Sequence, residues 1–136
     1  MTARTPRAIS NDAFHQIKAD YPERSFANAL RDGKITERDI TLIRSFIAEM
    51  QSSRNTSTKR AYKLTYTLVG WRRFIGPYEQ NDMAALYTGI AALKSGTSKR
   101  GQEFKKNTIA YHIIILKQFY LWLVENEYTK IPEKKI

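Results

Sequence analysis

The chain has 136 residues, of which 42% are hydrophobic and 12% aromatic, so we expect a single globular domain with a packed core. It contains no cysteine, and its two histidines, His15 and His112, lie far apart in the sequence, which argues against a disulfide framework and against a zinc site. The longest apolar run, residues 119–124, is too short to span a membrane, and the first ten residues lack the apolar segment of a signal peptide. We therefore expect a cytoplasmic protein that uses no metal, no cofactor, no small-molecule ligand and no membrane.

The formal net charge of +10 is concentrated in two stretches of the chain. Between Met50 and Tyr78 there is no acidic residue, and the basic residues are Arg54, Lys59, Arg60, Lys63, Arg72 and Arg73. The second stretch contains one acidic residue, Glu103, among Lys94, Lys99, Arg100, Lys105, Lys106 and Lys117. A positive charge concentrated in this way is typical of a surface that binds a polyanion.

Apolar residues recur at spacings of three and four along the chain, which predicts an all-α fold. We expect residues 1–10 to be a flexible N-terminus and residues 11–35 to be a helical extension. The extension contains two short helices, 11–20 and 22–31, and Gly33 is suited to end the second.

The domain that follows, residues 36–127, is predicted to be a bundle of four helices. The first starts at Thr36, which can form a capping box with Asp39, and ends within the polar residues 51–56. The second begins at Ser57 or Thr58, and we expect it to continue to about residue 75, before the Gly76-Pro77 pair.

The third and fourth helices of the bundle are separated by a long basic loop, residues 95–106. Asn81 or Asp82 is expected to cap the third helix, and Asn107 or Thr108 the fourth, which runs to about Glu125. The loop is rich in Ser, Gly, Thr and Lys, so we expect it to be mobile in the free domain and ordered when bound to a polyanion.

The second helix of the bundle has two opposite stripes. The core stripe consists of Ala61, Leu64, Leu68, Trp71 and Ile75, and the other stripe of Lys59, Lys63, Tyr66, Gly70 and Arg73. A helix with a line of positive charge fits the major groove of DNA, where lysines reach phosphates. Gly70 has two explanations at this stage, a close approach of a ligand backbone or a helix crossing.

The last helix is apolar around most of its circumference and leaves a narrow strip for solvent: Ala110, Tyr111, Ile114, Lys117 and Gln118. Its N-terminus follows Lys105 and Lys106, and free backbone N–H groups there would add to an attraction for phosphate. We expect His112 to lie in or beside the core, and Trp71 and Trp122 to be packing anchors.

The order of these features resembles the N-terminal core-binding domain of phage integrases and other tyrosine recombinases. The resemblance rests on Ser57-Thr58-Lys59-Arg60-Ala61-Tyr62 in the second helix, on Asn107-Thr108-Ile109, and on residues 116–123, LKQFYLWL, in the fourth. It covers residues 36–132 and implies a SAM-like four-helix bundle that lays its second and fourth helices against the major groove of duplex DNA.

The resemblance also implies where the chemistry of the family resides. Strand cleavage belongs to a separate C-terminal catalytic domain, so this chain is expected to have no catalytic residue, and residues 128–136 are expected to be the start of a linker toward that domain. Further partners would be other protomers of a recombination complex. The expected DNA-binding residues are Thr58, Lys59, Arg60, Lys63, Tyr66, Arg73, Lys99, Arg100, Lys105, Lys106, Asn107, Thr108, Tyr111 and Lys117.

Two other functions are consistent with the residues alone. A stand-alone helical DNA-binding regulator would use the same basic surface, and a protein interaction module would present it to an acidic protein. An enzyme in its own right is the least expected function, because no cluster of His, Cys or paired carboxylates combines a nucleophile with a base.

Overall fold

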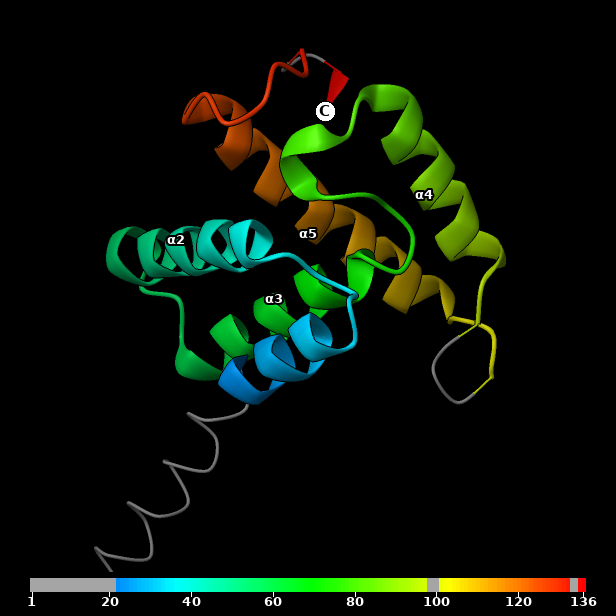
Figure 1. Ribbon diagram of the computed structural model, residues 1–136, viewed down its shortest axis with the longest axis horizontal. Coiled ribbons are helices and arrows are strands. Elements are labelled where there is room, and N and C mark those ends of the chain that lie inside the picture. Colours follow the sequence, from blue (N-terminus) through cyan, green and yellow to red (C-terminus); the bar gives the residue numbers. More distant parts are fainter. Residues whose placement is uncertain (1–21, 98–100, 133–134) are drawn as a thin grey trace, which may run out of the picture.

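The computed structural model describes residues 22–97, 101–132 and 135–136, and every regular element within them is helical (Figure 1). Residues 22–31 form a helix and are followed by α2 (Glu37–Arg54), α3 (Thr58–Trp71), a short 3-10 helix η1 (Tyr78–Gln80), α4 (Met83–Ser95) and α5 (Lys106–Glu125). The predicted all-α class is therefore confirmed. The expected helix over residues 11–20 lies outside the described residues. In the described part of the chain, no helix is both long and apolar enough to cross a membrane.

Local signals in the sequence set most helix ends. Thr36 and Asp39 form the predicted capping box, with the Asp39 N–H donating to Thr36 Oγ1 at 3.0 Å and the Thr36 N–H to Asp39 Oδ2 at 3.2 Å. Ser57 caps α3, and Asp82 caps α4. Gly33 adopts a φ of 71°, a left-handed conformation that ends the helix of residues 22–31 without steric cost.

The predicted cap of α5 and the predicted end of α3 were both wrong. Helix α5 begins at Lys106, so Asn107 and Thr108 lie inside its first turn, and no side chain caps it. Helix α3 ends at Trp71 instead of continuing to about residue 75. Residues 72–74 form a tight turn in which each N–H donates to the carbonyl three residues earlier. The guanidinium of Arg72 fixes this turn, because it donates to Ile75 O at 2.8 Å.

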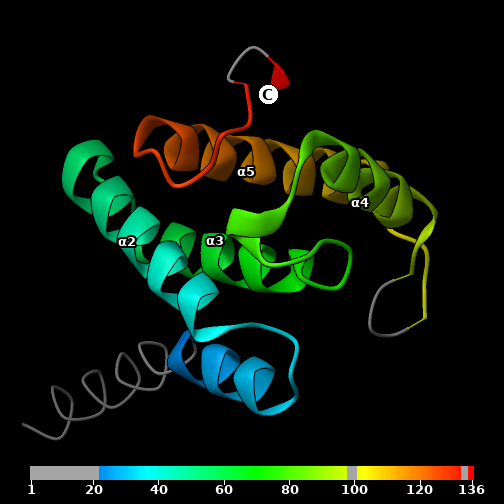
Figure 2. The same cartoon turned by 45° about the horizontal axis from the view of Figure 1, so that its top comes forward.

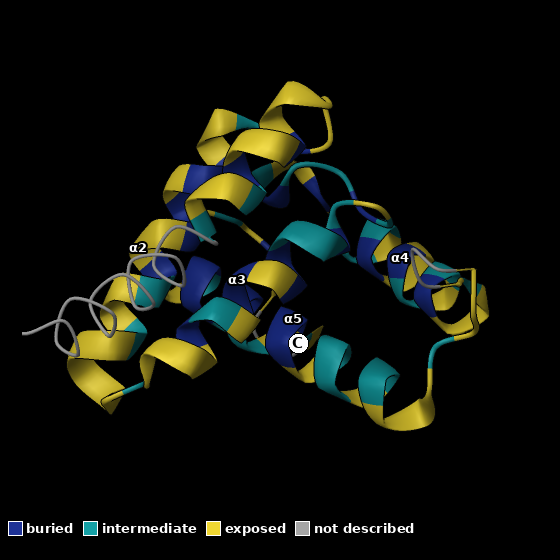
Figure 3. Ribbon diagram, turned by 90° about the horizontal axis from the view of Figure 1, so that it is seen from below, coloured by how far each residue is buried: buried dark blue, intermediate teal, exposed yellow. Residues whose placement is uncertain are grey.

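Helix α5 is the central element of the bundle (Figures 1 and 2). It packs against α3 and α4, and α3 also packs against α2. The helix of residues 22–31 and the C-terminal end of the chain lie at opposite ends of the molecule in both views. Figure 3 shows the buried residues of these helices on the sides that face one another, with exposed residues outward.

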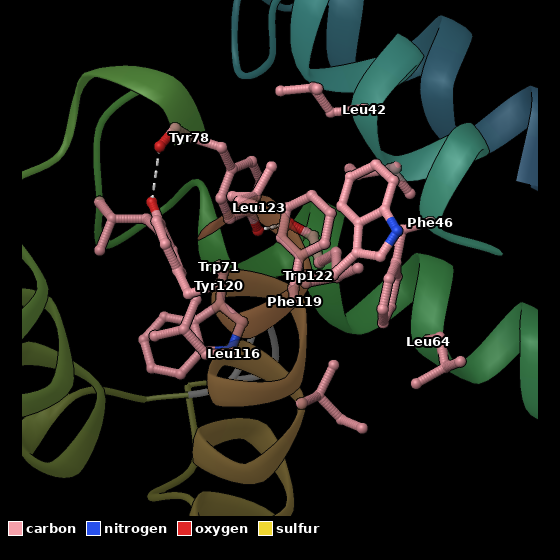
Figure 4. Packing of buried hydrophobic residues seen from close by; sticks show 14 of the residues in the cluster. Leu42, Phe46, Leu64, Trp71, Tyr78, Leu116, Phe119, Tyr120, Trp122 and Leu123 are labelled. Carbon is pink, nitrogen blue, oxygen red and sulfur yellow. Dashed lines mark hydrogen bonds between the residues drawn. The ribbon is translucent and has the colours of Figure 1, made fainter. Parts of the chain in front are cut away.

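Aromatic side chains from α2, α3, η1 and α5 meet in the core (Figure 4). The rings of Phe46 and Phe119 meet edge to face at 5.1 Å, and Trp122 stacks on Phe119 at 5.9 Å. Trp71 is fully buried and Trp122 is 6% exposed, which confirms both as packing anchors. Burial of this kind contributes about 1.5–3 kcal/mol for each large apolar side chain.

A buried polar network connects η1 to α5. The Tyr120 hydroxyl donates to Tyr78 O at 2.8 Å (Figure 4). It also accepts a hydrogen bond from Asn81 Nδ2 at 2.9 Å. The Tyr78 hydroxyl donates to Leu68 O. Burial raises the pKa of both tyrosines above the ordinary value, so both hydroxyls remain protonated donors at neutral pH.

Helix α4 approaches the turn after α3 closely at Gly89. A Cβ atom at this position would lie 2.3 Å from Ile75 Cγ2 and 3.0 Å from Phe74 O, so only glycine fits. This contact explains why an apolar helix has a glycine in its buried face.

The chain continues to pack against the bundle after α5. The Tyr128 ring centre lies 5.5 Å from the Trp122 ring centre and 5.3 Å from the Arg38 guanidinium. Ile131 is 7% exposed and belongs to the core cluster. Residues 128–131 therefore belong to the packed domain. The expected role of residues 128–136 as a linker stays a prediction.

The carboxylate of Asp39 is the most buried charge in the described structure. Its side chain is 1% exposed and accepts three hydrogen bonds: from the Thr36 N–H, from the Tyr78 N–H at 2.9 Å, and from Arg72 Nε at 2.8 Å. Arg72, at 12% exposure, is its partner in an ion pair. One side chain thus joins the start of α2, the end of α3 and the start of η1.

We expect Asp39→Asn to lower the free energy of unfolding by about 3–5 kcal/mol, because it leaves the partly buried Arg72 guanidinium without its counter-charge. The measurement is urea denaturation followed by circular dichroism. Glu79→Gln is the control, since it removes an exposed ion pair with Arg38, and it should change the stability far less than Asp39→Asn. Equal effects of the two substitutions would contradict a special role for Asp39.

Candidate nucleic-acid interface

The DNA-binding residues expected on the second helix are all exposed, but one of them, Arg73, does not lie on α3. Thr58, Lys59, Arg60, Lys63 and Tyr66 lie on α3 with exposed side chains. Arg73 lies in the turn after the helix, where its guanidinium donates to Thr97 O at 3.0 Å. The expectation that Arg73 continues the helical stripe was therefore wrong, because α3 ends before it.

A shallow hollow forms where α3 passes the first turns of α5. We call this the first hollow, and its lining residues are Lys63, Tyr66, Thr67, Asn107, Thr108, Tyr111 and His112. It brings together residues about forty positions apart that the sequence assigned separately to two contact points. Among the residues that the structure describes, no acidic side chain lines it.

The ring of Tyr111 organises the positive charge beside the first hollow. The Lys63 ammonium lies 5.0 Å from the centre of the ring, and the Arg60 guanidinium lies 5.6 Å from it. Both distances are within the range of cation–π attraction, which contributes about 0.5–1 kcal/mol at exposed sites. The two cations on α3 are thus held against a residue of α5.

The hydroxyl of Tyr111 is buried but has no hydrogen-bond partner among the described residues. A buried hydroxyl without a partner costs about 1–3 kcal/mol, and such groups are rare in native proteins.

The start of α5 completes the first hollow. Lys105 occupies the position before the helix, and Lys106 and Asn107 are exposed in its first turn. Since no side chain caps this end, the backbone N–H groups of the first turn add a positive potential to that of the two lysines. Lys117 is also exposed, but it lies farther along α5, outside the hollow.

His112 lies at the boundary of the core, as the sequence predicts. It is half-buried, with its ring 6.3 Å from Trp71 and 6.2 Å from Phe104, and its Nδ1 lies 2.8 Å from Thr108 O. Its carbonyl accepts the Trp71 Nε1–H at 2.8 Å, which fixes α3 against α5. Lys99 and Arg100 lie outside the described residues, so their expected contacts and the mobility of their loop stay predictions.

A second hollow lies between α3 and the helix of residues 22–31. Its lining includes Arg24, Asn28 and Lys34 from the N-terminal segment and Tyr66, Gly70 and Arg73 from α3 and the following turn. No function is predicted for residues 22–34, because the family resemblance begins at Thr36. The signal that was present is Gly33, which reverses the chain and brings Lys34 back toward α3.

Among the described residues that line the two hollows, one is acidic. It is Asp32, which lines the second hollow and forms an exposed ion pair with Arg31 at 3.4 Å. Arg72 belongs to the first basic stretch of the sequence, but its pairing with Asp39 removes it from the basic surface.

No group of three or more His, Cys, Asp or Glu residues in the described part of the chain could hold a metal ion.

Tyr111→Phe and Tyr120→Phe each remove one buried hydroxyl group, but they should affect the free energy of unfolding differently. The first removes a hydroxyl without a partner and should leave the free energy of unfolding unchanged or raise it by about 1 kcal/mol. The second removes a hydroxyl with two partners and should lower it by about 1–3 kcal/mol. Urea denaturation of both variants is the measurement, and a loss of stability in Tyr111→Phe would show that its hydroxyl is satisfied.

Comparison with known proteins gave no match to a family model and no significant similarity to a curated protein or a solved structure.

Proposed function

We propose that this chain binds duplex DNA and is a core-binding domain of the tyrosine-recombinase type. The observation that carries the proposal is the first hollow, in which Lys63, Tyr66, Asn107, Thr108 and Tyr111 meet and whose described lining contains no acidic residue. In this proposal α2–α5 are the four helices of the SAM-like bundle. Helix α3 is then its second helix and α5 its fourth, the two that the family resemblance assigns to DNA.

The chemistry of the first hollow fits a nucleic-acid backbone with access to base edges. The exposed ammonium groups of Lys59 and Lys63 suit phosphates, while Asn107 and Thr108 supply short polar groups for phosphate or base edges. An α-helix fits the major groove, which is about 12 Å wide, and α3 presents its exposed face without an acidic residue.

The proposal gives the chain a binding role and no catalytic role. Strand cleavage would belong to a catalytic domain of the same parent protein, and other protomers of a recombination complex would be further partners. A stand-alone DNA-binding regulator would share the DNA surface, whereas an acidic protein partner would not require a fit to a duplex.

We expect the protein to bind duplex DNA with a strong dependence on salt. If about five phosphates are neutralised, the logarithm of the binding constant should fall against the logarithm of salt concentration with a slope of about −4.5. The measurement is fluorescence anisotropy of a labelled duplex over a salt series. A slope near zero would contradict DNA binding and favour an acidic protein as the partner.

The double substitution Lys59→Ala/Lys63→Ala should make this slope less negative by about 1.8, since each lost phosphate contact contributes about 0.9. Both side chains are exposed, so cooperative thermal unfolding should be retained. The matched control is Lys130→Ala/Lys135→Ala, which removes the same charge from the C-terminal tail. Equal slopes for the two double variants would show that net charge alone governs binding.

A further inference from the structure

We propose that the second hollow, between α3 and the helix of residues 22–31, binds the sugar-phosphate backbone of the same DNA. The inference rests on the proposed function and extends the interface to a segment outside the family resemblance. It gives residues 22–34 a role in holding DNA, in addition to their packing role at the edge of the bundle.

The two hollows share one wall. Tyr66, with 43% of its surface exposed, lines both of them and separates them along α3. Lys63 in the first hollow and Gly70 in the second are seven residues apart, which is about 10 Å along a helix. This distance corresponds to about three base-pair steps of 3.4 Å. A DNA strand that follows α3 therefore passes over Tyr66 from one hollow to the other.

The charge of the second hollow complements a phosphate backbone. Arg24, Lys34 and Arg73 contribute three positive charges, and Asp32 contributes one negative charge that is already paired with Arg31. Asn28 adds an amide at the same surface. Lys34 and Arg73 also line an adjoining depression, so the positive surface continues beyond the hollow.

Gly70 leaves the backbone of α3 open at the second hollow. A Cβ atom at Gly70 would have no atom of another described segment within 4 Å, so no crossing of α3 by a described helix requires a glycine. Among the described residues, the explanation that remains is a close approach by a ligand. Glycine inside a helix lowers stability compared with most residues. At Gly70 the missing side chain leaves open space above the backbone of α3.

Two substitutions test the second hollow by different routes. Lys34→Ala removes a charge, and at 0.1 M salt it should weaken duplex binding about eightfold and make the salt slope less negative by about 0.9. Gly70→Gln fills the open space with a better helix former, so it should weaken DNA binding while the thermal midpoint stays the same or rises. A gain in stability together with a loss of affinity is not expected from a merely structural glycine.

The matched controls change the same chemistry elsewhere on the protein. Lys130→Ala removes a lysine from the C-terminal tail, at the opposite end of the molecule, and Ala91→Gln places a glutamine on the exposed side of α4. Both should bind DNA like the unaltered protein in the same anisotropy titration. If Gly70→Gln loses cooperative unfolding, Lys34→Ala decides the question on its own.

The outcomes separate this inference from the proposed function. Weaker binding by Lys34→Ala and Gly70→Gln, with unchanged controls, supports the second hollow as a backbone site. Salt-dependent binding by the unaltered protein that neither substitution changes would overturn the second hollow and leave the first intact. Absence of salt-dependent binding by the unaltered protein would overturn both proposals.

Discussion

The carboxylate of Asp39 joins three segments that are distant in the sequence, and the shape of the proposed interface depends on it. It accepts hydrogen bonds from the start of α2, from the start of η1 and from the Arg72 guanidinium at the end of α3. Because Arg72 is drawn inward, the helix ends at Trp71 and the chain turns. Arg73 is then left on the outside, beside Lys34 and Gly70. An internal ion pair thus decides which of two adjacent arginines faces solvent.

The aromatic core has a similar consequence for α5. Most of the circumference of this helix is buried against α3, α4 and the segment around η1, so only a narrow strip faces outward. The hydrogen bond from Trp71 Nε1 to His112 O sets the level at which α3 passes α5. That level places Lys63 and Tyr66 beside Asn107, Thr108 and Tyr111. The first hollow is therefore a result of how the core packs.

The sequence predicts those features that depend on neighbouring residues. The caps at Thr36, Ser57 and Asp82, the left-handed Gly33 and the core stripe of α3 all follow from residues within one or two turns. The early end of α3 could not be predicted, since it depends on a contact between Asp39 and Arg72, which are 33 residues apart. The second hollow could not be predicted either, because it arises only when Lys34 returns to α3.

The positive charges of the proposed interface are positioned as well as concentrated. Tyr111 holds the Arg60 and Lys63 side chains over its ring at 5.6 Å and 5.0 Å, and Thr97 O holds the Arg73 guanidinium. A free lysine or arginine loses about 0.5–1.5 kcal/mol of side-chain entropy when a ligand immobilises it. Side chains that are already restrained lose less, so the same charges would bind a phosphate backbone more tightly. This restraint distinguishes Arg60 and Lys63 from Lys130 and Lys135, which are exposed and show no cation–π contact within the described part of the chain.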